Sequence, residues 1–238
     1  MKFKKLKELS EAIDKKEFGV VVDFLNSYPG CDTFEKFKNI LIDWEYHTSD
    51  TLNLTIAEKS IKIQLSYIIN QLPSNIQDDI LLSSGGFDFV LNIPKKFKST
   101  SMVAMEDLIQ SVSYNGINLK VCEFSEEEYQ TFLNFLPASV FNDFLNLAIK
   151  HKEKVITFDN PSLKDIKLDF MTNEPLGFLF GLLGNFSRDY FRQIMFYLSK
   201  RVPSDVIMNS DIKDIEFYIE EYNRETKDQQ ESTNHSIA

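Results

Sequence analysis

The dipeptide Asn115-Gly116 is the feature that most constrains the fold. It lies between two largely apolar segments, residues 108–114 and 117–124. Asn-Gly is a favoured centre of a two-residue type I′ turn, because both central positions of that turn need positive φ angles. The sequence therefore predicts an antiparallel hairpin, and any fold of this chain has to include β structure.

Helix signals follow the predicted hairpin. Ser125 and Glu128 have the spacing of a capping box, which predicts a helix with Phe132 on its apolar face. Pro137 suits the first position of a second helix, because proline lacks the N–H that this position leaves unpaired. We expect the second helix to end near residue 151.

The N-terminal half has helical spacing of its apolar residues before residue 51. Three helices are predicted there, over residues 6–16, over residues 18–25, and from the N-cap pair Asp32 and Glu35 to residue 47.

Strand spacing follows from residue 51 onward. Alternating apolar residues in 52–56 and 61–65 predict a hairpin through Glu58-Lys59, although residues 61–72 also fit a helix. Residues 87–93 are predicted to form a strand, which Gly85-Gly86 opens.

The rest of the chain is predicted to be mostly helical. Short strands are expected at 155–158 and 166–170, and helical segments at 175–183, at 190–198, near Ser204 and from Ser210 or Asp211 onward. The predicted fold class is α+β, mainly helical with short antiparallel β-hairpins. We expect an N-terminal α+β region at 1–97, a hairpin-plus-helices domain at 98–225 and a disordered tail at 226–238.

Charge and hydropathy exclude several classes of protein. The formal net charge is −10, which argues against a nucleic-acid binder, because phosphate contacts need clustered Lys and Arg. The longest apolar run, residues 176–184, is too short for stable insertion in a membrane. The N-terminus has no unbroken apolar segment typical of a secretory signal, and Cys31 and Cys122 form no motif, so we expect a reducing compartment.

Signals for catalysis and cofactor binding are weak, so no catalytic, cofactor-binding or metal-binding residue is assigned. His47 lies four residues after Asp43, but no further ligand is near in the sequence, which favours a solvated helix end over a metal site. An enzyme of unrecognised type would need a polar pocket around His47, Cys122 or the residues 123–128.

Phenylalanine dominates the aromatic residues, with 21 Phe against 9 Tyr and 1 Trp. Near the apolar run 176–184 these rings are denser than a small core usually needs, and aromatic residues are enriched at protein interfaces. The cluster is either ordinary core or a partner surface. As the partner-binding surface we select Phe178, Phe180, Phe186, Tyr190 and Phe191.

A series of motifs in the second half resembles a known family. After the Asn115-Gly116 hairpin come the following segments, in this order: Phe124-Ser125-Glu126-Glu127-Glu128, Phe132-Leu133-Asn134-Phe135-Leu136-Pro137, Pro175-Leu176-Gly177-Phe178-Leu179, Phe196-Tyr197-Leu198-Ser199-Lys200 and Asp214-Ile215-Glu216-Phe217-Tyr218-Ile219-Glu220-Glu221-Tyr222-Asn223. This order is similar to that in the baseplate hub assembly proteins of T4-like bacteriophages, and the resemblance covers residues 105–225.

The resemblance implies a late viral protein, without enzymatic activity, that helps the baseplate hub of a contractile tail to assemble in the cytoplasm of the host cell. Its implied partners are hub or tail proteins, and no cofactor is implied. The alternatives are a permanent minor structural subunit of the baseplate and an enzyme of unrecognised type. Homo-oligomerisation is left open.

Overall fold

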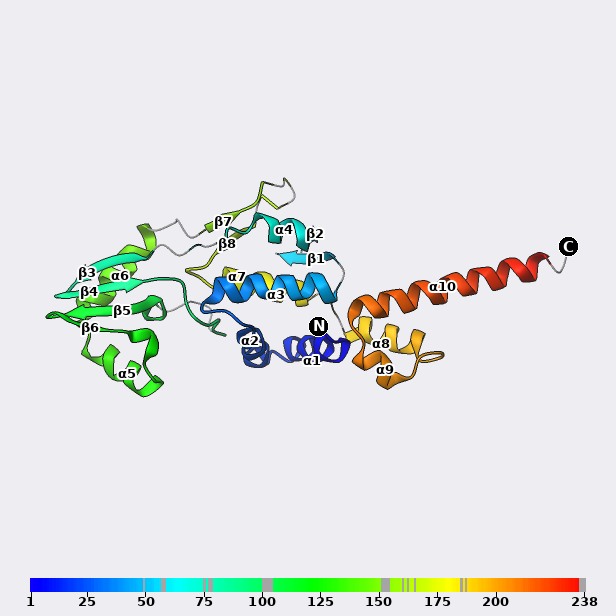
Figure 1. The fold of residues 1–238 in the computed structure, drawn as a ribbon, viewed down its shortest axis with the longest axis horizontal. Helices are drawn as coiled ribbons and strands as arrows, with labels where there is room; N and C mark the ends of the chain where they lie inside the picture. The colour runs from blue at the N-terminus through cyan, green and yellow to red at the C-terminus, as the bar shows by residue number, and fades with distance from the viewer. Residues whose placement is uncertain are drawn as a thin grey trace. The chain divides into compact units, whose positions relative to one another are not determined.

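The computed structural model describes residues 1–48, 50–56, 59–74, 76, 79–99, 105–150, 155–159, 161, 163–164, 166–184, 186 and 188–235 (Figure 1). Its first elements are α1 (Phe3–Asp14), α2 (Phe18–Asn26), α3 (Thr33–His47), β1 (Thr51–Ile56), β2 (Lys59–Gln64), α4 (Leu65–Gln71), β3 (Ile80–Ser84) and β4 (Phe87–Leu91). The middle of the chain forms η1 (Met105–Leu108), β5 (Ile109–Tyr114), β6 (Ile117–Leu119), η2 (Val121–Glu123), α5 (Glu126–Phe135) and α6 (Ala138–Lys150). The last elements are β7 (Val155–Thr157), β8 (Lys167–Asp169), α7 (Glu174–Leu183), α8 (Arg188–Leu198), α9 (Ser204–Asn209) and α10 (Ile212–His235).

The predicted fold class is confirmed, because the described chain is mainly helical and its sheets are small and antiparallel. The sheets are β1-β2, β3-β4-β5-β6 and β7-β8. The predicted turn at Asn115-Gly116 joins β5 to β6, and its two φ angles are 50° and 80°. These positive values are the conformation that the Asn-Gly pair predicts.

Two predicted N-caps are present. The Ser125 hydroxyl accepts a hydrogen bond from the Glu128 N–H, and the Glu128 carboxylate accepts one from the Ser125 N–H, so the capping box opens α5. Asp32 Oδ1 accepts from the Glu35 N–H at 2.8 Å and opens α3. Each cap satisfies backbone N–H groups that the first helical turn leaves unpaired.

Other boundaries differ from the predicted ones. Residues 61–72 fit either a strand or a helix in the sequence. In the structure, residues 59–64 form strand β2 and residues 65–71 form helix α4. The predicted turn residue Glu58 lies outside the described residues, as do residues 151 and 236–238. Strand β6 ends at Leu119, and α10 continues through residues 226–235 of the predicted tail.

Contacts divide the chain into two compact units, which interleave along the sequence. Unit 1 comprises Met1–Val21, Leu41–Ile69 and Phe180–Ala238, and unit 2 comprises Val22–Ile40 and Asn70–Leu179. The domain boundary expected at 97/98 thus falls inside unit 2.

Unit 1 contains helices and the β1-β2 hairpin, and part of its core is aromatic. Phe3 of α1 meets Phe191 of α8 edge to face, with ring centroids 5.0 Å apart. The Ser10 hydroxyl donates a hydrogen bond to the Phe186 carbonyl oxygen, and the Phe3 N–H donates to the Ser210 carbonyl oxygen at 2.9 Å. These contacts hold α1 against α8, against Phe186 just before α8 and against Ser210 just after α9. The first half of α10 contacts α8, where the Tyr197 hydroxyl donates a hydrogen bond to Asn223, and the rest of α10 extends beyond α8 and α9 (Figure 1).

Unit 2 contains the four-stranded sheet, with α5 and α6 on one face. Ile80, Phe89, Val112, Val140 and Phe144 belong to its buried core, which joins three strands to α6. Across the described chain, no helix is both long enough and apolar enough to cross a membrane.

Candidate functional site: two neighbouring cavities in unit 2

The sheet of unit 2 is apolar on one face because its register aligns apolar side chains across strands. Phe87 pairs with Tyr114, which in turn pairs with Ile117, while Val112 pairs with Leu119. Since directly paired residues lie on the same face, these side chains form a continuous apolar surface. The opposite face is more polar, as the pairs Asp88–Ser113 and Ser113–Asn118 show.

An apolar groove lies between this face and α5, and its volume is about 820 Å³. We call this cavity the apolar groove. Its lining residues come from β4, β5, β6 and α5 with the residues just before it: Phe87, Val112, Tyr114, Leu119, Phe124, Ser125, Glu127, Glu128, Thr131, Phe132 and Phe135. The volume is within the range of sites that take a ligand or the side chains of a peptide.

The rings and aliphatic side chains at the edge of the apolar groove are open to solvent. Phe135 is 79% exposed, Tyr114 45% and Leu119 41%. Isolated exposed apolar residues are normal, but a group of them around a cavity is typical of an interaction surface.

The α5 side of the apolar groove is held in place by the helix N-cap. Hydrogen bonds from the backbone and hydroxyl of Ser125 hold the pKa of the Glu128 carboxyl below its usual value, so this carboxylate is ionised at neutral pH. Together with the exposed Glu127 it gives the groove an acidic rim.

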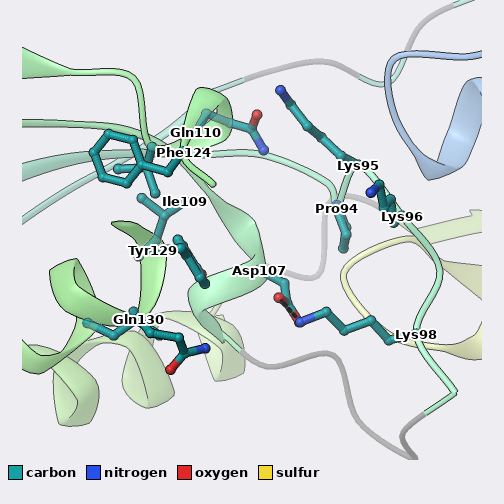
Figure 2. Close-up of a pocket in the computed structure, with 12 residues that line it drawn as sticks. Pro94, Lys95, Lys96, Lys98, Asp107, Ile109, Gln110, Phe124, Tyr129 and Gln130 are labelled. Atoms are coloured by element: carbon teal, nitrogen blue, oxygen red, sulfur yellow. Dashed lines mark hydrogen bonds and ion pairs between the residues drawn. The ribbon is translucent and has the colours of Figure 1, made fainter. Parts of the chain in front are cut away.

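A second, smaller cavity of about 240 Å³ is rimmed by lysines, and we call it the lysine pocket (Figure 2). Lys95, Lys96 and Lys98 line it from one side, and Tyr129 and Gln130 of α5 line it from the other. The remaining lining residues are Pro94, Asp107, Ile109, Gln110, Val121, Phe124 and Leu133. Phe124 lines both cavities, so the two are neighbours.

Hydrogen bonds to α2 and α3 hold the lysine-bearing segment. The Asn26 side chain donates to the Phe97 carbonyl oxygen and accepts from the Phe97 N–H, both at 2.8 Å. The Thr33 N–H donates to the Pro94 carbonyl oxygen, also at 2.8 Å. These hydrogen bonds hold the segment 94–97 against α2 and α3 within unit 2.

Lys36 adds a buried contact to the same segment. Its ammonium group donates to the carbonyl oxygens of Gly30 at 2.7 Å and Lys95 at 2.8 Å. Burial lowers the pKa of Lys36, and the two carbonyl oxygens satisfy the donors that burial removes from water.

The residues selected from the sequence as the partner surface lie elsewhere and are mostly inaccessible. Phe178, Phe186 and Phe191 are buried, whereas Phe180 and Tyr190 are half-buried. Burial, together with the nearby Glu216, raises the pKa of Tyr190 to about 12. Phe178, Phe186 and Phe191 are therefore core residues, which is the first of the two alternatives, whereas a partner surface at Phe180 and Tyr190 stays a prediction. Phe178 contacts Phe37, and Phe186 contacts Phe191.

The described side chains weighed for catalysis belong to different units of the chain, His47 to unit 1 and Glu123, Glu127 and Glu128 to unit 2. His47 is paired with carboxylates in unit 1: Nδ1 lies 3.1 Å from Asp211 Oδ2, and Nε2 lies 3.5 Å from Asp43 Oδ1. Glu123 pairs with Lys120 at 3.0 Å, and Glu127 and Glu128 line the apolar groove. Within the described ranges, no group of three or more His, Cys, Asp and Glu side chains could hold a metal ion.

Cys31 is exposed and is not in a disulfide. Partial burial of the thiol raises its pKa, and Glu35 and Asp32 raise it further, to about 11. A thiol with this pKa is almost entirely protonated at neutral pH and is a poor nucleophile.

No protein-family model, no curated protein and no solved structure matches the chain. Sequence reasoning also missed both cavities. The Asn115-Gly116 turn and the Ser125 cap placed two of the groove walls correctly, but the sequence does not show that the space between these walls stays unfilled.

Proposed function

We propose that this protein is a non-enzymatic assembly factor that binds a partner protein through the apolar groove. The observation that carries the proposal is the apolar groove, which no described residue fills, with Phe135, Tyr114 and Leu119 exposed at its edge. Covering these side chains removes apolar surface from water, which is the main favourable term in protein association.

The occupant we propose is a segment of a partner protein with apolar side chains next to Lys or Arg. The charged groups on the groove rim are the carboxylates of Glu127 and Glu128. The whole chain carries a net charge of −10, so a basic partner segment is attracted and a second copy of the chain is repelled.

The partner class follows from the resemblance of residues 105–225 to baseplate hub assembly proteins of T4-like bacteriophages. This stretch includes β5, β6 and α5, which form most of the groove. We therefore propose that hub or tail subunits of a contractile-tailed phage are the partners, that binding takes place in the host cell during assembly, and that the chain acts without a cofactor.

The experiment is co-expression of the chain with hub subunits of the same phage, followed by affinity purification. The wild-type chain should retain a hub subunit in stoichiometric amount, and Phe135→Ser should lose most of it. Truncating a central interface aromatic typically costs 2 kcal/mol or more of binding free energy, or roughly thirtyfold in affinity.

The matched control is Phe196→Ser. Phe196 is 73% exposed, nearly as much as Phe135, but lies on α8 outside the groove. The control should retain the hub subunit as the wild type does. Equal retention by both variants, or no retention of any hub or tail subunit by the wild-type chain, would contradict the proposal.

A further inference from the structure

We propose that the lysine pocket binds carboxylate groups of the same partner segment that occupies the apolar groove. This inference rests on the proposed function and adds a second contact of opposite charge. The partner segment would then carry acidic side chains at the end that reaches the pocket.

The first argument is charge. In a chain with ten more acidic than basic residues, Lys95, Lys96 and Lys98 line one small cavity. Asp107 is the only carboxylate among its described lining residues, and it forms an ion pair with Lys98. The described lining therefore contains three ammonium groups and one carboxylate, a composition that favours an anionic group.

The second argument is rigidity. The hydrogen bonds from Asn26, Thr33 and Lys36 fix the backbone at Pro94, Lys95 and Phe97 before any ligand arrives. A lysine on a fixed backbone loses less conformational freedom on binding than one on a mobile loop, so more of the attraction is realised as affinity.

The third argument is the shape and lining of the cavity. Ile109 and Val121 are buried and form an apolar part of the pocket lining, while Lys95 and Lys96 are exposed at its rim. The Gln110 side chain adds an amide whose N–H already donates to the Ile93 carbonyl oxygen at 3.4 Å. A volume of about 240 Å³ suits the end of a side chain rather than a whole cofactor.

The fourth argument is continuity with the apolar groove. Phe124 lines both cavities, and on α5 the neighbouring residues Phe132 and Leu133 line the groove and the pocket respectively. One segment can therefore place apolar side chains in the groove and an acidic side chain in the pocket.

The direct test uses N-acetyl-triglutamate as the probe and the whole 238-residue chain, with its lysines carrying ¹³C-methyl groups. The Lys95 and Lys96 methyl signals should shift on titration, and the shifts should disappear at high salt. The exposed Lys164 serves as the internal control. Shifts at Lys95 and Lys96 no larger than at Lys164 would overturn the proposal. Stronger shifts with inorganic phosphate than with triglutamate would assign the pocket to phosphoryl groups and overturn the carboxylate assignment.

The second test uses the co-purified hub subunit. Lys95→Glu combined with Lys96→Glu should weaken its affinity by at least about tenfold, because the double variant removes charge-assisted hydrogen bonds to the carboxylates and adds like charges. Lys164→Glu should leave the affinity unchanged. Unchanged affinity of the double variant overturns the pocket proposal while the proposed function stands. Triglutamate shifts without any hub binding would support an anion pocket and contradict the proposed function.

Discussion

Phe191 in unit 1 and Phe135 in unit 2 are both phenylalanines on helices, yet their exposed fractions are 1% and 79%. Phe191 lies against Phe3 and Phe186, and its ring is part of the core. Phe135 ends α5 at the edge of a cavity that no described residue fills. The difference separates rings that stabilise the fold from rings that are available to a partner, a distinction that aromatic content alone does not make.

The largest expected loss of stability is at Phe191, the buried ring of the two. Phe191→Ala removes a ring between α1 and α8 and should lower the free energy of unfolding by about 3–5 kcal/mol. Urea denaturation followed by circular dichroism measures the loss. An unchanged urea midpoint would mean that Phe191 is not a core residue and would break the comparison.

The wall of the apolar groove should be more tolerant. Gly116→Val places a β-branched residue at a φ of +80° in the β5–β6 turn, where L-residues are strained by about 1–2 kcal/mol. No neighbouring atom lies within 4 Å of an added Cβ, so the loss comes from the backbone conformation. Urea denaturation should show this smaller loss, with hub binding also weakened because Tyr114 and Leu119 shift. A loss as large as that of Phe191→Ala would mean that the hairpin is a core element.

A third test concerns Asp211 of unit 1, whose contribution to the free energy of unfolding depends on pH. Burial raises the pKa of Asp211, but the contacts with Lys2 and His47 outweigh it and leave the pKa below its usual value. A carboxyl with a lowered folded-state pKa stabilises the fold above its unfolded-state pKa, and this contribution disappears as the pH falls through the folded-state value.

Asp211→Asn should therefore cost about 1 kcal/mol at neutral pH and progressively less below about pH 4. Urea denaturation from pH 3 to 7 measures this difference. Asp205→Asn, at an exposed carboxyl on α9 with no ion pair in the described chain, is the matched control and should cost less at neutral pH than Asp211→Asn. A cost that does not fall with pH would show that the ion pairs are not its source.

The smallest effect on stability is expected at Phe135. Because the side chain is mostly exposed, Phe135→Ser should change the free energy of unfolding by no more than about 0.5 kcal/mol. The same urea experiment that detects Phe191→Ala provides the measurement. A loss of several kcal/mol would place Phe135 in the core and remove the distinction between the two rings.

Local features of the fold could be predicted because their chemistry lies within a few residues. Asn115-Gly116 determines its turn through backbone φ angles, and Ser125 with Glu128 caps α5 through contacts three residues apart. Strand β3, in contrast, was not predicted. It becomes a strand by pairing with β4, and residues 80–84 carry no strong local pattern of their own.

Burial was harder to predict, because it depends on contacts between distant residues. The all-apolar segment containing Phe178 fits core and interface equally well in sequence, and its contact with Phe37 decides for the core. The lysine pocket likewise depends on Asn26 and Lys36, which bond to residues 71 and 59 positions away. No short window of the sequence contains these pairs.

Phe124 lines both cavities, so its position affects binding at each of them. A ligand that moves this ring on entering the apolar groove also changes the shape of the lysine pocket. Binding at the two cavities is then linked. A ligand in the apolar groove changes the affinity of the lysine pocket by the same factor as a ligand in the pocket changes the affinity of the groove. In the proposed complex, this one aromatic side chain couples the binding of the two ends of the partner segment.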